Sequence, residues 1–142
     1  MRKAATNDTS FGELHIKDET DIVFARRTVR DAASQLGFGQ TDVTRIVTAA
    51  SELARNIFKY AGEGVMRWRR IENGRSFGVE LQFLDRGPGI QDTDLAMQDG
   101  FSTSGGLGMG LPGARRLMDE LEIQSAPGQG TTVTLRKWRR NY

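Results

Sequence analysis

The chain has 142 residues, of which 20 are Lys or Arg and 18 are Asp or Glu, so its formal net charge is +2. It has no cysteine and a single histidine, His15, which excludes disulfides, zinc fingers, thiol catalysis and multi-histidine metal sites. The weak net charge gives no argument for nucleic acid, and no apolar run is long enough to cross a membrane. We therefore expect a soluble, cytoplasmic protein in which His15 is a surface residue.

The first 17 residues predict a polar segment followed by a short strand. Residues 1–10 are polar, and we expect them to be disordered. Leu14 and Ile16 alternate with polar residues, which predicts a short strand over 11–17.

Two predicted helices come next. Thr20 and Asp21 have side chains suited to an N-cap, and the periodic segment after them predicts a helix to Leu36. A second helix is predicted from about 42 to Tyr60, because its apolar residues keep three-to-four spacing. These residues form one stripe and are Val43, Ile46, Val47, Ala50, Leu53, Ala54 and Ile57.

The C-terminal half predicts two hairpins separated by a loop and a helix. The runs 65–71 and 77–84 are typical of strands, and Asn73-Gly74 between them is a strong turn signal. We then expect, in order, a short helix near 92–98, a glycine-rich loop over 100–110, a helix from Leu111 to Leu121, and a closing hairpin of strands 122–125 and 131–138.

This order of elements predicts an α+β fold in a single domain over residues 11–142. We expect a two-layer sandwich, in which a mixed, mostly antiparallel sheet is covered on one face by about three helices. Arginines and lysines surround Trp68 and Trp138, a pattern that can serve nucleic acid binding. They alternate with apolar residues at strand period, so we favour solvated faces and edge-strand charges.

The second predicted helix has a polar face that could do chemistry. On a helical wheel Glu52 and Asn56 point away from the apolar stripe, and they lie one turn from each other. Arg45, Arg55 and Lys59 share this polar side. On most helices such a face only contacts water. Alternatively, the carboxylate is a proton acceptor and the amide oxygen a ligand for a hard cation such as Mg²⁺.

An acid stands at the end of a predicted strand, directly before two glycines. Asp85 is followed by Gly87 and Gly89, which have no Cβ and let a flat ligand approach the backbone. The Asp85 carboxylate could accept a hydrogen bond from an exocyclic amine of that ligand, or it could merely cap a turn.

The segment from Gly100 to Gly113 is dense in glycine and leads straight into a helix. Backbone amides at such a place, with the helix N-terminus, can receive phosphate. A loose surface loop is the alternative, but a segment this rich in glycine within a compact domain favours a functional lid.

These elements, in this order, resemble the ATP-binding fold shared by gyrase, Hsp90, histidine kinases and MutL, also called the Bergerat-type fold. Its N box is matched by Glu52-x-x-x-Asn56, its first glycine box by Asp85-x-Gly87-x-Gly89, its second by Gly106-x-Gly108-x-Gly110, and its late threonine by Gly130-Thr131. The segments 51–57, 99–108, 110–113 and 116–120 are, more narrowly, similar to the RsbT-like serine/threonine switch kinases of the bacterial stressosome.

The resemblance implies a role for each matched residue. Asp85 would accept the adenine amino group with support from Thr131, Asn56 would bind Mg²⁺ that bridges the phosphates, and Glu52 would be the general base for the acceptor hydroxyl. The backbone of 104–110 would close over the phosphates. The implied nucleotide-binding residues are Asn56, Asp85, Gly87, Gly89, Ser104, Gly105, Gly106, Leu107, Gly108, Gly110 and Thr131.

The resemblance also implies an activity and partners. The chain would be an ATP-dependent protein serine/threonine kinase that phosphorylates STAS-domain antagonist and scaffold proteins and, when released, activates a PP2C-type phosphatase in stress signalling. One alternative is an anti-sigma factor kinase, which holds a sigma factor and phosphorylates an anti-anti-sigma protein. A second is a non-catalytic, ATP-gated interaction module, against which Glu52 argues.

Overall fold

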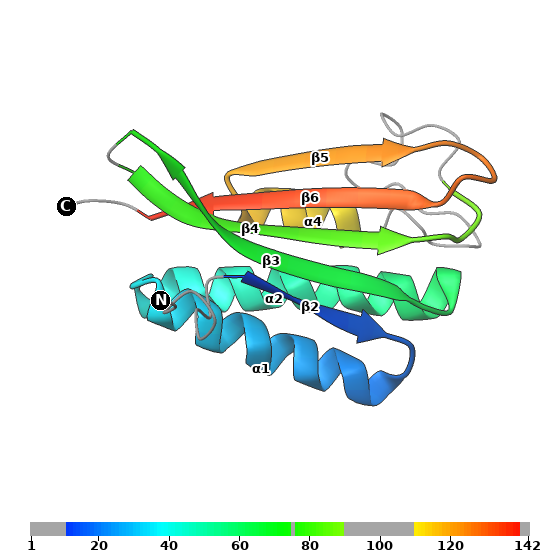
Figure 1. Cartoon of the computed structure of the whole chain (residues 1–142), viewed down its shortest axis with the longest axis horizontal. Helices are drawn as coiled ribbons and strands as arrows, with labels where there is room; N and C mark the ends of the chain where they lie inside the picture. The colour runs from blue at the N-terminus through cyan, green and yellow to red at the C-terminus, as the bar shows by residue number, and fades with distance from the viewer. Residues whose placement is uncertain (1–10, 75, 90–109, 140–142) are drawn as a thin grey trace, which may run out of the picture.

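The computed structural model describes residues 11–74, 76–89 and 110–139 (Figure 1). Their elements, in chain order, are β2 (Phe11–Ile16), α1 (Glu19–Gln35), α2 (Gln40–Asn56), the π-helix η1 (Ile57–Ala61), β3 (Gly64–Asn73), β4 (Ser76–Asp85), α4 (Gly110–Leu117), β5 (Glu120–Ser125) and β6 (Thr131–Trp138). The expected disorder of 1–10, the short helix near 92–98 and most of the loop over 100–110 lie outside the described residues.

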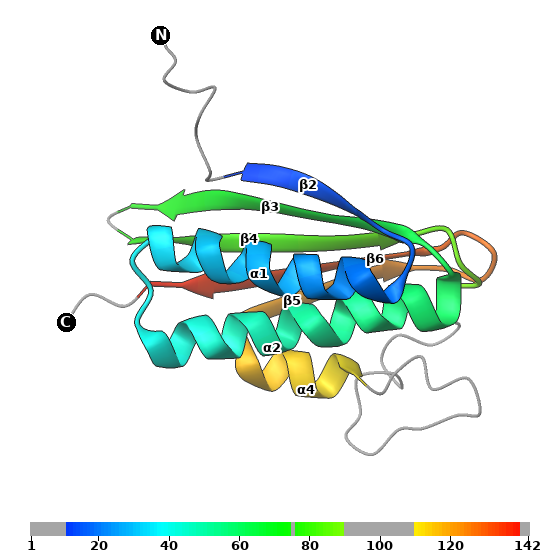
Figure 2. The ribbon, with the colours of Figure 1, turned by 90° about the horizontal axis from the view of Figure 1, so that it is seen from below.

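The described strands form one five-stranded sheet in the order β2-β3-β4-β6-β5. All four pairings among them are antiparallel, so the predicted mixed character of the sheet is wrong for these strands, while its mostly antiparallel character is confirmed. Figure 2 shows α1, α2 and α4 on the same face of the sheet, so none of the described helices covers the other face, which we call the open face. The predicted α+β two-layer architecture is confirmed.

The core lies between the helices and the covered face of the sheet. Every residue of the predicted α2 stripe is buried, and the strands contribute large side chains with no solvent exposure such as Met66, Leu81 and Leu135. Burying an apolar side chain of this size contributes roughly 1.5–3 kcal/mol, so this layer carries most of the stability.

Helix α1 begins two or three residues earlier than predicted. Its N-cap is Asp18, whose carboxylate accepts a hydrogen bond from the Asp21 amide at 3.2 Å, while the Asp21 carboxylate accepts from the Asp18 amide at 3.2 Å. The predicted N-cap at Thr20 or Asp21 is therefore wrong: Asp21 occupies the N3 position of a capping box whose N-cap is Asp18.

The second helix changes its winding before it ends. It is α-helical only to Asn56, and residues Ile57–Ala61 form a π-helical turn that stops at Gly62, where φ is +86°. The prediction of one regular helix to Tyr60 is therefore wrong after Asn56. Isolated π turns of this kind are rare and frequently lie at functional sites.

The third helix is shorter than predicted. It ends at Leu117, and Leu121 lies in β5, which begins at Glu120 rather than at Glu122. The buried Lys137 ammonium, from β6, donates a hydrogen bond of 2.9 Å to the Leu117 carbonyl oxygen. It thereby satisfies an acceptor that the end of the helix leaves unpaired. Both predicted hairpins are present, although the β3–β4 turn follows Asn73, which still pairs with Ser76.

Candidate functional site

Three predicted site residues, from three different elements, line one small cleft. Asn56 is the last residue of α2, Asp85 ends β4, and Thr131 begins β6. Figure 1 shows these element ends together at one end of the molecule. The lining residues are Leu53, Asn56, Ile57, Phe83, Asp85, Leu111, Thr131 and Val133. The cleft thus has an apolar lining with a carboxylate, an amide and a hydroxyl, which is the composition of a small-molecule site.

The Asp85 carboxylate is held in place by backbone. Its Oδ1 accepts a hydrogen bond from the Gly87 amide at 2.8 Å, and the Thr131 amide donates to the same carboxyl group. Burial raises the pKa of this half-buried carboxyl group, and the two amides oppose that shift without cancelling it. Two amides therefore fix the orientation of an acceptor that is only partly solvated.

Thr131 sits beside Asp85 in the sheet. It is 9% exposed, and it pairs in register with Asp85 on one side and with Ser125 on the other. The hydroxyl groups of Thr131 and Ser125 are 2.8 Å apart, and the Ser125 hydroxyl is also 2.8 Å from the Gly130 carbonyl oxygen. Ser125 therefore orients the Thr131 hydroxyl, a role that the sequence analysis missed.

The glycines next to Asp85 are required by close backbone approach. Gly89 has φ +79°, and a Cβ there would collide with the Ala126 carbonyl oxygen. Gly130 has φ +76°, and a Cβ there would collide with the Asp85 carbonyl oxygen. At Gly87 a Cβ would lie 2.7 Å from the Ala61 Cβ. The loop after β4 therefore packs directly on the β5–β6 turn and on the end of η1.

Glu52 and Asn56 lie together on the surface of α2, as predicted. A Cβ on Gly110 would lie 3.0 Å from Asn56 Nδ2 and 3.4 Å from Glu52 Cβ, so the first residue of α4 packs against both side chains. Glu52 also forms an ion pair of 3.3 Å with Arg55, and both side chains are about half exposed. The carboxylate is therefore accessible and oriented by a neighbouring guanidinium, which the sequence analysis had counted only as part of a polar face.

The chemistry of this face suits Mg²⁺. An amide oxygen and a carboxylate one turn apart are hard oxygen donors, which Mg²⁺ prefers. Among residues 11–74, 76–89 and 110–139, no group of three or more acidic or histidine side chains could hold a metal alone. Mg²⁺ in nucleotide sites usually takes only one or two protein ligands and its remaining ligands from substrate phosphates and water.

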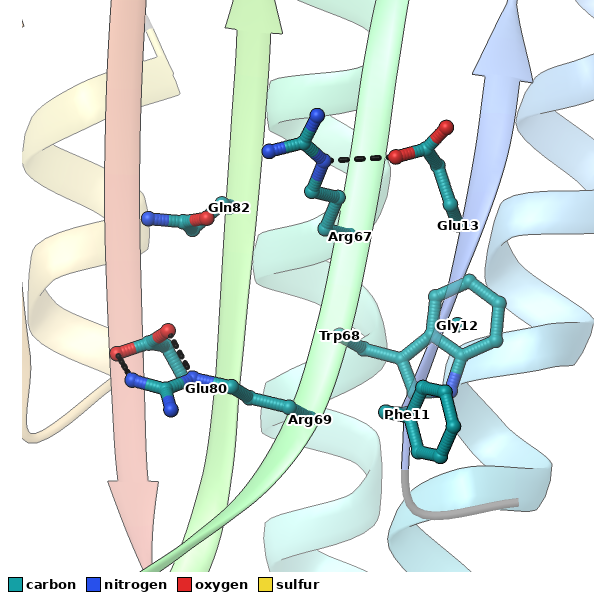
Figure 3. Close-up of a pocket in the computed structure, with 8 residues that line it drawn as sticks. All are labelled: Phe11, Gly12, Glu13, Arg67, Trp68, Arg69, Glu80 and Gln82. Carbon is teal, nitrogen blue, oxygen red and sulfur yellow. Dashed lines mark hydrogen bonds and ion pairs between the residues drawn. The ribbon is translucent and has the colours of Figure 1, made fainter. Parts of the chain in front are cut away.

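The open face of the sheet carries a second hollow, which holds none of the predicted site residues (Figure 3). There Glu80, 4% exposed, lies between Arg69 at 2.8 Å and Arg136 at 2.9 Å, and Arg67 pairs with Glu13 at 2.7 Å. Burial alone would raise the pKa of Glu80, but the two guanidiniums lower it overall. The charges in this hollow neutralise one another.

These contacts revise the predicted role of the basic clusters around the tryptophans. Arg67, Arg69 and Arg136 do point to the open face, but β3 and β6 are interior strands, so they do not protect sheet edges. Lys137 is buried rather than solvated, with Asp42 and Asp119 3.8 and 3.7 Å from its ammonium group. His15 is on the surface as expected, 2.9 Å from Glu63.

The predicted phosphate-binding residues Ser104, Gly105, Gly106, Leu107 and Gly108 lie outside the described residues. Gly110 is described, as the first residue of α4 and not as part of a loop. None of the described helices is long and apolar enough to cross a membrane.

Comparison with known proteins decides the family. The family model for histidine kinase-, DNA gyrase B- and HSP90-like ATPases matches residues 41–141. The chain belongs to this ATPase family. That match covers α2, the cleft and all elements after it, and the family implies that the chain uses ATP.

Curated relatives narrow the assignment. The serine/threonine-protein kinase RsbT of Bacillus subtilis is 50% identical over 127 residues, which cover 89% of this chain and 96% of RsbT. An anti-sigma F factor from a Thermoanaerobacter species is 35% identical over 121 residues, with 81% and 83% of the two chains covered. The chain is accordingly an RsbT-like serine/threonine-protein kinase within the ATPase family.

Solved structures share the fold. The RsbU and RsbW domains of a Mycobacterium tuberculosis protein match with a TM-score of 0.60 and 23% identity, over 91% of this chain and 33% of that one. The SiaB–SiaC complex of Pseudomonas aeruginosa matches with a TM-score of 0.54 and 14% identity, over 90% and 88%. At these identities the likeness concerns the fold alone.

Proposed function

We propose that this ATPase-family kinase phosphorylates a Ser or Thr on STAS-domain antagonist and scaffold proteins and, when released from them, activates a PP2C-type phosphatase. One observation carries the proposal: Asn56, Asp85 and Thr131 meet in a single cleft, with Glu52 one turn from Asn56. The 50% identity with a named serine/threonine-protein kinase supports the same activity.

In this proposal the strand ends bind the purine. The Asp85 carboxylate, held by the Gly87 and Thr131 amides, accepts a hydrogen bond from the adenine amino group. The Thr131 hydroxyl, oriented by Ser125, supports the ring edge. Gly87 and Gly89 let the loop after β4 pack closely on Ala61 and Ala126, which holds the end of the strand beside the place where the base would bind.

The face of α2 handles the phosphates. Asn56 would ligate Mg²⁺, which when bound neutralises phosphate charge and orients the γ-phosphate. Glu52 accepts the proton of the acceptor hydroxyl while the hydroxyl oxygen attacks the γ-phosphorus. The bond between the γ-phosphorus and the β,γ-bridging oxygen breaks, and ADP leaves. Arg55 holds the Glu52 carboxylate outward, where an acceptor from another protein can reach it.

The glycine-rich segment completes the site. We propose that the backbone of residues 104–110, including Ser104, Gly105, Gly106, Leu107 and Gly108, contacts the phosphates. The contact of Gly110 with Asn56 and Glu52 supports this, because it brings the end of that segment directly to the phosphate-binding face. Exclusion of water by such a segment favours transfer to a hydroxyl over hydrolysis.

A second candidate is an anti-sigma factor kinase. Its support is the group of anti-sigma F factors that are 32–38% identical to this chain. The two candidates share the ATP site and differ in the protein that is held, so binding to a sigma factor or to a phosphatase discriminates between them.

The test is transfer of radiolabelled phosphate from ATP to small STAS-domain proteins of the same organism, with the modified residue mapped by mass spectrometry. We expect one Ser or Thr on such a protein to be labelled, and labelling to require Mg²⁺. The unphosphorylated acceptor should compete with a PP2C-type phosphatase for this chain. Labelling of no STAS protein, or binding to a sigma factor in place of the phosphatase, would overturn the proposal.

A further inference from the structure

Ser125 lies behind the purine end of the cleft, next to Thr131. It is the last residue of β5 and pairs in register with Thr131, the first residue of β6. Residues paired across an antiparallel ladder point to the same side of the sheet, so both side chains lie on the face that the helices cover. Among the described residues, Thr131 belongs to the cleft lining and Ser125 does not. Ser125 therefore acts on the cleft through its contact with Thr131.

The Ser125 hydroxyl contacts two oxygen atoms. Its oxygen lies 2.8 Å from the Gly130 carbonyl oxygen and 2.8 Å from the Thr131 hydroxyl oxygen. A carbonyl oxygen can only accept a hydrogen bond, so the contact with Gly130 requires the proton of Ser125. Gly130 is buried, where an unsatisfied carbonyl would be costly. The Ser125 hydroxyl therefore donates its proton to the Gly130 carbonyl.

This hydrogen bond sets the direction of the Thr131 hydroxyl. A hydroxyl has one proton and two lone pairs. Because the Ser125 proton points to Gly130, the contact between the two hydroxyls is a hydrogen bond only if Thr131 donates to Ser125. The Thr131 oxygen then offers only lone pairs to the cleft. Ser125 thus makes Thr131 a hydrogen-bond acceptor at the purine end.

The polar group beside Thr131 is an acceptor as well. Thr131 pairs in register with Asp85, and the Gly87 and Thr131 amides both donate to the Asp85 carboxyl group. An ionised carboxylate that receives these amide protons can only accept further hydrogen bonds. The purine end therefore presents two oxygen acceptors from neighbouring strands.

Two acceptors distinguish purines by the substituent at C6. The 6-amino group of adenine carries two protons and can donate one to each oxygen. The 6-oxo group of hypoxanthine or guanine has only lone pairs, so in the same pose it would face two acceptors without a proton between them. Sites built to pair one polar group reject an analogue that leaves their own buried groups unpaired.

We propose that Ser125 is a positioning residue that holds the Thr131 hydroxyl as an acceptor and thereby makes the site selective for 6-aminopurine over 6-oxopurine nucleotides. This inference rests on the proposed binding of adenine at Asp85 and Thr131, and it adds a residue outside the cleft that determines base specificity. Without Ser125, the Thr131 hydroxyl is free to rotate and to donate its proton to a 6-oxo group.

The test measures the Kd values of ATP and of inosine triphosphate (ITP) by calorimetry with Mg²⁺. ITP carries hypoxanthine, which has a 6-oxo group and a proton on N1, in place of adenine. We expect the wild type to bind ITP at least about tenfold more weakly than ATP, and Ser125→Ala to lower the ratio of the two Kd values by about three- to tenfold, which corresponds to one hydrogen bond. The ratio does not depend on the folded fraction, because both nucleotides bind the same folded protein.

Two further variants serve as controls. Ser125→Thr keeps the hydroxyl and should retain the wild-type ratio. Gln124→Ala changes the exposed neighbour of Ser125 on β5, whose side chain points to the open face because successive strand residues alternate. This variant should leave the ratio unchanged as well.

A double-mutant cycle separates orientation of the hydroxyl from a merely structural role. Thr131→Val removes the hydroxyl and should lower the ratio by itself. In that background, Ser125→Ala should change the ratio by less than about twofold, because no hydroxyl remains to be oriented. An equal effect of Ser125→Ala in both backgrounds would overturn the inference.

The same measurements distinguish this inference from the proposed function, since they need no phosphate transfer. A ratio that changes in Thr131→Val but not in Ser125→Ala would overturn the role of Ser125 and leave the purine site intact. A ratio unchanged in both variants would overturn the inference together with the proposed adenine contact. If the ratio falls as expected while no STAS-domain protein is labelled, the role of Ser125 is supported and the kinase proposal alone is overturned.

Discussion

The purine end and the phosphate end of the proposed ATP site are built in opposite ways. At the purine end, strand termini and glycine turns touch through backbone atoms, and Asp85 is fixed by two amides. At the phosphate end, Glu52 and Asn56 project from the surface of one helix, and the Glu52 carboxylate forms an exposed ion pair with Arg55. The purine end therefore depends on backbone contacts that also hold the fold together, whereas the phosphate end consists of two surface side chains on which the fold does not depend.

This contrast predicts different consequences of substitution. Changes at the phosphate end should reduce the rate and leave stability unchanged, because an exposed ion pair such as Glu52–Arg55 contributes little, typically about 0–1 kcal/mol. Changes at the purine end should alter nucleotide affinity and stability together.

The largest effect is expected for Glu52→Gln, which removes the proposed base at nearly constant shape. We expect the rate of phosphate transfer to fall by about 10²–10⁴, while ATP affinity and the melting temperature stay near wild type. Single-turnover transfer and calorimetry measure the two quantities. Transfer at near-normal speed would remove Glu52 from this role.

Gly130→Ala tests the backbone contact at the purine end. The new Cβ would collide with the Asp85 carbonyl oxygen at a residue with φ +76°, and we expect a loss of about 2–5 kcal/mol in the free energy of unfolding. Gly128→Ala is the matched control: its φ is +78° but a Cβ there meets no atom within 4 Å. Denaturant titration should show a loss of only about 1–2 kcal/mol for the control, and equal losses would contradict the close contact.

Asp85→Asn tests the proposed adenine contact. Because a hydrogen bond to a charged group contributes roughly 1.5–3 kcal/mol, we expect ATP to bind about ten- to a hundredfold more weakly. GTP, which lacks the adenine amino group, should be affected less. An ATP titration that superimposes on that of the wild type would refute the assignment.

Asn56→Ala tests the proposed Mg²⁺ ligand. We expect the Mg²⁺ concentration for half-maximal transfer to increase by about tenfold, because one oxygen ligand is lost while the phosphate ligands remain. Activity measured across a Mg²⁺ series gives this value. An unchanged midpoint would mean that Asn56 does not ligate the metal.

The smallest effect is the pH dependence from Asp85. Since the pKa of this carboxyl group is raised in the folded state, the folded protein binds the proton more tightly than the unfolded chain does. Stability should therefore decrease as pH rises from the ordinary aspartate pKa through the raised one, and Asp85→Asn should remove that slope.

In the same experiment, Glu80 should change stability with pH in the opposite direction. Its folded pKa is lowered, so its contribution is present above the ordinary glutamate pKa and is lost as pH falls through the lowered value. Denaturant midpoints of the wild type, Asp85→Asn and Glu80→Gln across acidic pH measure both slopes, and slopes of equal sign would contradict the assignments.

Local patterns were sufficient to predict most of the fold. Apolar periodicity placed α2 and its buried stripe, and turn residues placed both hairpins. The errors arose where a distant residue decides the outcome. Leu121 fits the spacing of the third helix, but Lys137 from β6 takes the Leu117 carbonyl and the chain continues as a strand.

The candidate site follows the same rule. The positions of Glu52, Asn56, Asp85 and Thr131 could be read from their motifs, since each motif is local. The contacts of Ser125 with Thr131, of Arg55 with Glu52 and of Gly110 with Asn56 depend on packing between elements, as does the π turn after Asn56. Periodicity carries no signal for such contacts.

A crystal structure with a non-hydrolysable ATP analogue and Mg²⁺ tests the central claim most directly. We predict that the adenine amino group donates a hydrogen bond to the Asp85 carboxylate and that Mg²⁺ is bound by the Asn56 side-chain oxygen, with the γ-phosphate facing Glu52. A nucleotide whose base lies away from Asp85, or whose metal does not contact Asn56, would contradict the account.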